Sequence, residues 1–224
     1  MYLLRQIEIA PFFRPASGIF HFKHLPIVRL LAASYNAAMS DFNLTHHFLI
    51  AMPAMQEGAF AGTLTYVCEH NENGALGIVV NRPLSLTLGE MFDQINIPLH
   101  QPRLEKMPVY FGGPVQTERG FVLHDAPGNW QSTLRINSNL ALTTSRDILD
   151  AVGQGEGPRH LIITLGYAGW DQGQLEHEIT ENAWLTMPAS EHILFDLPPE
   201  ERLPAAMALL GVSYASLVEN AGHA

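Results

Sequence analysis

Short runs with a strand-like pattern, separated by turn residues, make up most of the chain from residue 44 onward. Residues 63–70 and 75–81 read as two strands, and Asn73-Gly74 between them suits the positive φ values of a tight hairpin. Residues 161–165 form an uninterrupted apolar run of strand length, which predicts a central strand of a sheet. Further strands are predicted over residues 44–52, 109–111, 120–124, 183–187 and 192–195.

Helix signals are few and local. Thr87-Leu88-Gly89-Glu90 fits a capping box, in which Thr87 and Glu90 satisfy backbone N–H groups, so a short helix should run to about Ile95. A second helix is predicted over residues 146–152, capped by Thr144 or Ser145 and ended by a series of glycines.

Two further helices are predicted toward the C-terminus. Residues 166–170 carry two glycines and should lead into a helix capped by Asp171. A last helix should start near Pro198 and stop at Gly211. Pro204 within it predicts a kink or a late start, because proline removes one helical hydrogen bond. Many strands with few helices predict a single strand-rich α+β domain with the helices at its periphery.

The first 38 residues differ from the rest of the chain. They hold four bases and one acid, whereas residues 39–224 hold eight bases and 21 acids, a net charge of −13. Their basic and aromatic character is similar to that of a signal or transit peptide. However, Arg29 interrupts the apolar segment, and Pro15 and Pro26 break any continuous helix. We therefore expect an extension outside the fold, with translation starting at Met39 and one domain over residues 39–224.

Composition narrows the class of protein. A net charge of −10 over 224 residues, with 47% hydrophobic residues, predicts one acidic globular domain with a substantial core. An acidic body repels the phosphate backbone, so nucleic acid is an unfavourable partner. The single cysteine, Cys68, allows no intramolecular disulfide, and no run of about eighteen uncharged apolar residues occurs. These features predict a cytoplasmic protein that does not cross a membrane.

Cys68 and His70 stand two residues apart on a predicted strand, so their side chains should leave the same face. A thiolate activated by an imidazole would supply the nucleophile of a hydrolase or a transferase. Alternatively, Cys68 is a small buried apolar residue, as lone cysteines on strands usually are. The sequence locates no orienting acid and no oxyanion hole, so both interpretations stay open.

Asn81-Arg82-Pro83 closes the second strand of the hairpin. An amide and a guanidinium at a strand end, fixed by the following proline, suit a carboxylate or a phosphate. The alternative is a surface turn in which Arg82 pairs with one of the 21 acids.

Two glycine motifs follow predicted strands. Gly112-Gly113 allows the close approach of a ligand or of another chain segment, and a strained turn is an equal alternative. Gly166-x-x-Gly169-x-x-x-Gly173 precedes a predicted helix start, where free N–H groups favour anions. Its spacing matches neither of the two common phosphate-binding motifs, and Asp171 would occupy the same place.

The helix after Asp171 carries a polar face formed by Gln174, Glu178 and Glu181. His177-Glu178-x-x-Glu181 resembles half of a zinc-protease motif but lacks its second histidine. We interpret this face as a solvated surface and expect neither a metal nor a cofactor.

Taken in order, several motifs resemble the AlgH/YqgE family of bacterial proteins over about residues 39–220. The resemblance implies a cytoplasmic α+β fold built from a coiled, mixed and branching β-sheet, and one named member is associated with regulation of alginate production. It implies no particular reaction. The extension before Met39 and the proline at position 204 depart from the family pattern. The motifs that carry the resemblance are Asn43-Leu44-Thr45, Cys68-Glu69-His70-Asn71, residues 77–83, Phe111-Gly112-Gly113-Pro114-Val115, Gly166-Tyr167-Ala168-Gly169-Trp170, Gly173-Gln174-Leu175-Glu176 and Glu181-Asn182-x-Trp184.

We expect a non-catalytic or regulatory protein that binds an unidentified small molecule or protein. The first alternative is a hydrolase or transferase that uses Cys68 and His70, and the second is a scaffold that self-associates through edge strands. Polar and glycine residues gather at predicted strand ends, where pockets form. The predicted ligand-binding residues are Asn81, Arg82, Gly112, Gly113, Gly166, Trp170, Gln174 and Glu178.

Overall fold

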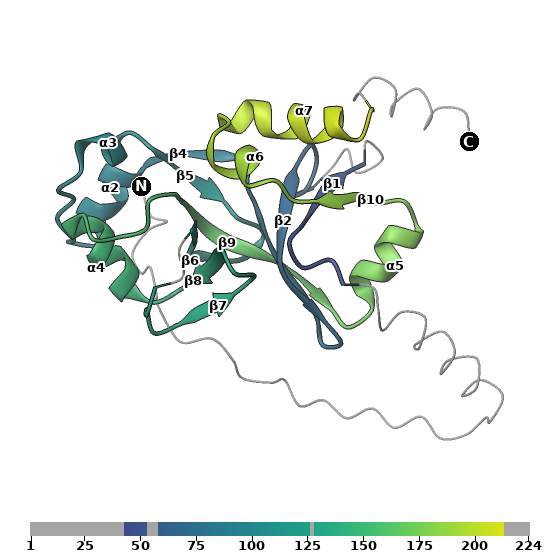
Figure 1. Ribbon diagram of the computed structural model, residues 1–224, viewed down its shortest axis with the longest axis horizontal. Coiled ribbons are helices and arrows are strands. Elements are labelled where there is room, and N and C mark those ends of the chain that lie inside the picture. The colour runs from purple at the N-terminus through teal and green to yellow at the C-terminus, as the bar shows by residue number, and fades with distance from the viewer. Residues whose placement is uncertain (1–42, 53–57, 126–127, 213–224) are drawn as a thin grey trace.

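The computed structural model describes residues 43–52, 58–125 and 128–212, which form ten strands and six short helices (Figure 1). The predicted extension over residues 1–38 and the start at Met39 fall outside the described residues. The strands are β1 (His47–Ala51), β2 (Leu64–Asn71), β3 (Gly74–Val79), β4 (Pro83–Thr87), β5 (Pro108–Phe111), β6 (Val115–Asp125), β7 (Thr133–Arg135), β8 (Leu140–Thr143), β9 (Leu161–Asp171) and β10 (Trp184–Pro188). The helices are α2 (Leu88–Gln94), α3 (Pro102–Glu105), α4 (Arg146–Gln154), α5 (Gln174–Thr180), α6 (Glu191–Phe195) and α7 (Pro199–Leu209).

The ten strands form one mixed, branched sheet, as the α+β prediction requires. Its main path runs in the order β10-β1-β2-β3-β9-β6-β8-β7, with antiparallel neighbours throughout. Strand β5 pairs with β9 in parallel and with β4 in antiparallel, which creates the branch. Strand β9 is therefore the central strand, as the apolar run at residues 161–165 predicts.

Two local predictions are confirmed, although the turn of the hairpin lies one residue earlier than the predicted pair Asn73-Gly74. In the hairpin, β2 pairs with β3 and Asn71 lies opposite Gly74, so Glu72 and Asn73 form the two-residue turn and Gly74 has the positive φ of 127°. At the start of α2, the Glu90 carboxylate accepts from the Thr87 backbone N–H at 2.8 Å while the Thr87 hydroxyl accepts from the Glu90 N–H. This is the predicted capping box.

Three predictions in the second half are wrong. Residues 192–195 were expected to form a strand but lie in helix α6, where Ile193 and Leu194 are both buried in the main core. Residues 166–170 continue β9 as a strand instead of leading into a helix. Consequently α5 starts later, with Gly173 and not Asp171 at its N-cap.

The predicted ends of helices α4 and α7 are confirmed only in part. Ser145 occupies the N-cap position of α4 but its side chain makes no capping bond, and Gly155 ends the helix with a φ of 85°. Helix α7 begins at Pro199 with Pro204 inside it, so the late start is wrong.

Helices cover the sheet in three groups (Figure 1). Helices α2, α3 and α4 gather at one end of the molecule, α5 lies at the other end beside β10, and α6 and α7 run along a third side. Each group covers an apolar cluster, centred respectively on Phe92, on Trp170 and on Tyr66. These three cores fix the strand ends that carry the predicted site residues.

Candidate functional site

The thiol of Cys68 is enclosed in the main core. Its side chain is 1% exposed and lies at a register shift between β2 and β3, where Val67 and Glu69 pair with consecutive residues of β3. Burial raises the pKa of the Cys68 thiol far above its ordinary value. A buried thiol with a raised pKa is a poor nucleophile.

The imidazole of His70 is held by the protein on both ring nitrogens. Nδ1 accepts from the backbone N–H of Leu44 at 3.0 Å, so Nε2 carries the hydrogen and donates to the Glu176 carboxylate at 3.1 Å. His70 thereby ties the start of the described chain to helix α5. With Nδ1 and Nε2 so engaged, no lone pair remains to accept the Cys68 proton, and the geometry gives no support to thiol activation.

Asn81 and Arg82 both bind the turn that precedes β2, residues 58–62. Asn81 accepts from the Leu64 N–H at 2.8 Å and donates to the Gly62 carbonyl at 3.0 Å. The two terminal nitrogens of Arg82 donate to the carbonyls of Ala59 and Ala61 at 2.8 and 2.7 Å. The guanidinium fork that was expected to face an anion or an acid thus holds backbone carbonyls.

The three predicted glycines meet where the connection between β5 and β6 passes β9. A Cβ on Gly112 would lie 2.2 Å from the Gly166 carbonyl oxygen, and one on Gly113 would lie 2.2 Å from the Tyr167 carbonyl. A Cβ on Gly166, whose φ is 75°, would lie 2.4 Å from the Gly113 carbonyl oxygen. These glycines permit two backbones to touch, which accounts for Gly112-Gly113 as the approach of another chain segment.

Trp170, Gln174 and Glu178 form one connected cluster with a residue of β10. Oε2 of Glu178 accepts from the indole N–H groups of Trp170 at 2.9 Å and Trp184 at 2.7 Å. Oε1 accepts from the Gln174 side-chain amide at 2.9 Å. The half-buried carboxylate therefore fastens α5 to two strands, β9 and β10, that are separated by three strands in the sheet order.

The aromatic rings of this cluster continue to the 58–62 turn. Phe60 stacks on Trp170 with ring centroids 6.2 Å apart and meets Trp184 edge-on at 5.4 Å. Phe60 belongs to the turn that Asn81 and Arg82 hold. Five predicted residues are thus brought together around one turn and one helix, which we call the turn–helix site: Asn81, Arg82, Trp170, Gln174 and Glu178.

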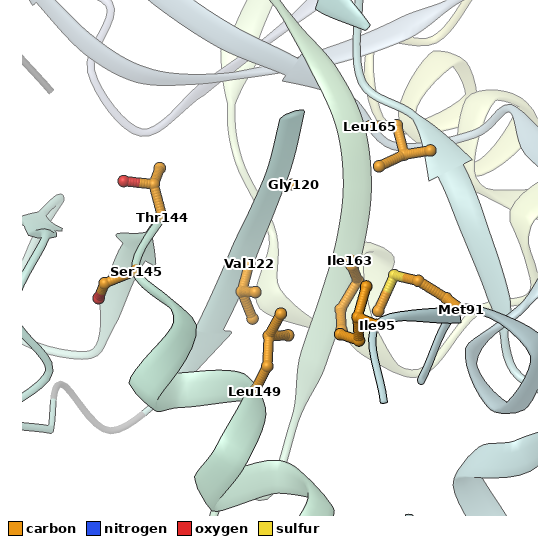
Figure 2. A pocket seen from close by; sticks show the side chains of 9 residues that line it. All are labelled: Met91, Ile95, Gly120, Val122, Thr144, Ser145, Leu149, Ile163 and Leu165. Carbon is orange, nitrogen blue, oxygen red and sulfur yellow. The ribbon is translucent and has the colours of Figure 1, made fainter. Parts of the chain in front are cut away.

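A small cavity elsewhere in the sheet is lined by none of the predicted site residues. It lies between β6, β9 and helices α2 and α4 and has a volume of about 10 Å³, which is room for about one water molecule. Figure 2 shows that its lining is apolar apart from Thr144 and Ser145. Its volume leaves no room for a ligand larger than water.

Comparison with known proteins places this fold and these motifs in a family. A family model described as AlgH-like matches residues 48–215. The chain belongs to the AlgH-like family. A UPF0301 protein of Dechloromonas aromatica is 59% identical over 186 residues, covering 83% of this chain and all of that protein. A UPF0301 protein of Nitrosospira multiformis is 57% identical over the same coverage.

Solved structures agree with this membership. The solution structure of the AlgH protein from Pseudomonas aeruginosa is 54% identical and covers 83% of this chain and 98% of its own, with a TM-score of 0.68. A crystal structure of a protein from Corynebacterium diphtheriae is 20% identical with a TM-score of 0.58, covering 78% of this chain and 91% of its own, and shows a shared fold.

Sequence reasoning missed three residues of this AlgH-like chain that the turn–helix site and its support depend on. Phe60 and Trp184 complete the aromatic cluster, and their aromatic side chains were the only signal in the sequence that could have indicated this. Arg202 on α7 is 5% exposed, donates to the carbonyls of Val80 and Leu197 and lies 5.1 Å from the Tyr110 ring centroid. Its charge on a surface-type helix gave no sign that it would be buried.

The AlgH-like chain shows neither a cluster of metal-ligating side chains nor a membrane-spanning helix within the residues that the structure describes. Within residues 43–52, 58–125 and 128–212, no three His, Cys, Asp or Glu side chains converge to hold a metal ion. None of the helices in the same residues is long and apolar enough to span a membrane.

Proposed function

We propose that this AlgH-like chain is a regulatory protein that binds a small molecule or a protein partner and does not use Cys68 as a catalyst. One observation carries this proposal. Neither member of the candidate catalytic pair is available for catalysis, because the Cys68 thiol is buried and both ring nitrogens of His70 have partners. A thiol enzyme needs an accessible thiolate and a base with a lone pair directed at it.

The turn–helix site is the surface that we propose for recognition. Its aromatic base is rigid, because one carboxylate bonds both indoles and Phe60 packs on both rings. Polar groups surround this base: Gln174 is exposed, and Arg82 is half-buried with two of its donors used by carbonyls. Because Trp170 and Trp184 are buried beneath the half-buried Phe60, a partner would contact Phe60 and the polar groups, an apolar surface with a few fixed polar groups.

The close contact between the β5–β6 connection and β9, which we call the glycine crossing, has a positioning role in this proposal. Gly112, Gly113 and Gly166 allow β5 to run beside β9, and Arg82 lies 5.7 Å from the ring centroid of Phe111 at the end of β5. The glycines therefore set the place of Arg82, and Arg82 sets the place of the 58–62 turn. The acidic charge of the chain argues against nucleic acid as the partner.

The proposal can be tested without knowing the ligand, by measuring the whole-cell proteome. A strain that lacks the gene is complemented with the natural chain or with Cys68→Ala, Arg82→Ala or Arg135→Ala. Arg135 is an exposed arginine of β7, at the opposite end of the sheet from β10, and is the matched control. We expect Cys68→Ala and Arg135→Ala to restore the natural proteome and Arg82→Ala to leave it as in the deletion strain.

Two controls make the outcomes decisive. Thermal unfolding of the purified variants shows whether each is folded, and Gln174→Ala replaces Arg82→Ala if the latter does not fold. A Cys68→Ala strain that behaves like the deletion would favour the thiol enzyme instead. A deletion strain with an unchanged proteome would contradict the regulatory role.

A further inference from the structure

A second cavity, remote in sequence from the turn–helix residues, has the composition of an anion site. It has a volume of about 140 Å³ and lies between helix α3, the residues just before β9 and the end of α6. Its lining consists of Arg103, Leu104, Met107, Arg159, His160, Leu161 and Phe195, and none of these side chains is acidic. Such a cavity can hold a small organic molecule, whereas the cavity of Figure 2 cannot.

Two arginines line this cavity in a chain that has few bases. Residues 39–224 hold eight bases against 21 acids, yet Arg103 and Arg159 both reach the same cavity. Within the part of the chain that the structure describes, Arg103 uses only Nε, which donates to the Gln101 side chain at 3.0 Å. Arg159 makes no hydrogen bond or ion pair with any residue of the described ranges and is exposed. Guanidinium groups without internal partners are suited to carboxylates and phosphates.

A histidine beside the arginines is held in one orientation. Asp125 accepts from the His160 backbone N–H at 3.1 Å and from its Nδ1 at 2.8 Å. The ring also stacks on Phe195, with centroids 5.6 Å apart and an angle of 28° between the planes. Nδ1 thus carries its hydrogen toward Asp125, and Nε2 has no partner among the described residues. A fixed ring with a spare nitrogen is the arrangement expected of a recognition group.

The remaining walls are apolar. Leu104 and Leu161 are buried at the base, and Met107 and Phe195 are half-buried at the sides. A ligand that satisfied only the arginines would leave this surface in contact with water. A flat apolar group beside the anion would cover it, and Phe195 offers a ring for stacking.

We propose that this cavity binds a small organic anion, a carboxylate or a phosphate monoester, whose flat apolar body packs against Phe195 while Arg103 and Arg159 hold the charge. His160, which lines the same cavity, completes the polar side with its Nε2. This proposal is independent of the turn–helix site, since the two sets share no residue.

The test is a titration of the isotope-labelled full chain with defined probes, followed by amide chemical shifts. Phenyl phosphate and benzoate carry both features, inorganic phosphate carries only the charge, and benzyl alcohol carries only the ring. We expect saturable binding of phenyl phosphate or benzoate, with shifts confined to residues 103–107, 159–161 and 195. Inorganic phosphate and benzyl alcohol should bind at least about tenfold more weakly, because each lacks half of the contacts.

Charge-removing variants localise the binding. Arg103→Gln and Arg159→Gln should each weaken it by about tenfold, the worth of one charge-assisted hydrogen bond. Arg135→Gln, which removes an exposed charge from β7, should leave it unchanged. No saturable binding of either organic anion overturns the proposal. Equal losses in all three variants would indicate general charge attraction and overturn it as well. Equal affinity for inorganic phosphate would contradict the apolar half of the ligand.

Discussion

The Glu178 carboxylate joins helix α5 to the indole N–H groups of both tryptophans, and its removal gives the sharpest stability prediction. In Glu178→Ala the indole N–H groups of Trp170 and Trp184 lose their acceptor, although these side chains are only 6% and 3% exposed. The change deletes three hydrogen bonds and leaves two donors in a largely dry environment.

The magnitude follows from the unpaired donors. An unsatisfied buried donor costs about 1–3 kcal/mol, and the bond to exposed Gln174 adds little. Water can reach Glu178 in part, since the residue is half-buried, so the lower half of that range applies to each indole. We therefore expect Glu178→Ala to lower the free energy of unfolding by about 3 kcal/mol. Glu178→Gln keeps one carbonyl for both indoles and should lose about half as much.

Urea unfolding followed by tryptophan fluorescence and by far-ultraviolet circular dichroism measures this loss. Glu181→Ala is the matched control, because Glu181 ends the same helix, is exposed and contacts only exposed His177 at 3.4 Å. The control should unfold like the natural chain. A Glu178→Ala variant within about 0.5 kcal/mol of the natural chain would refute the reasoning, since that is the size of an ordinary surface change.

Three further changes test other parts of the structure by the same unfolding measurements. Arg202→Ala should lower the free energy of unfolding by about 3 kcal/mol, because two backbone carbonyls lose a charged, buried donor. Gly113→Ala should cost at least about 3 kcal/mol through a backbone clash, whereas Gly120→Ala, with no atom within 4 Å of the new Cβ, should cost little. Desolvation lowers the pKa of His124 below its ordinary 6.5, so the neutral form stabilises the fold above that pH and this stability is lost as pH falls below it. His124→Gln should therefore flatten the fall in stability below pH 6.5.

Each of these has a contradicting result. An Arg202→Ala chain as stable as the natural one would mean that water replaces the arginine at the carbonyls. Equal costs at Gly113 and Gly120 would remove the argument for a close crossing. The pKa of His46 is also lowered by burial, so part of the pH dependence should survive in His124→Gln. An unchanged slope in that variant would contradict the role of His124.

Local signals in the sequence were sufficient to predict those elements whose hydrogen-bond partners lie a few residues away in the chain. The Thr87–Glu90 capping box and the hairpin at residues 71–74 are closed by neighbours, so residue type and spacing predict them. Ile193 and Leu194 show the opposite case, because a short apolar run fits a strand or a helix equally well until its packing partner is known.

The candidate site was recognisable by residue type but not by role. Arg82 and Asn81 were identified as unusual at a strand end, yet their partners are carbonyls about 20 residues earlier in the chain. Gly166 was interpreted as the approach to a helix, and it is the point where β9 touches a distant backbone. Contacts of this kind depend on the sheet order, which no local pattern contains.

The state of the Cys68 thiol in the native protein tests the central claim most directly. The full chain is treated with iodoacetamide between pH 6 and 10, and the alkylation of Cys68 is followed by intact mass, with a urea-unfolded sample as the reference. The account predicts no labelling of the folded chain over hours and complete labelling once it is unfolded, because the thiol is 1% exposed and its pKa is raised by burial. Rapid labelling of the folded chain, with an apparent pKa below the ordinary value of about 8.5 for a free thiol, would contradict it and restore the catalytic pair.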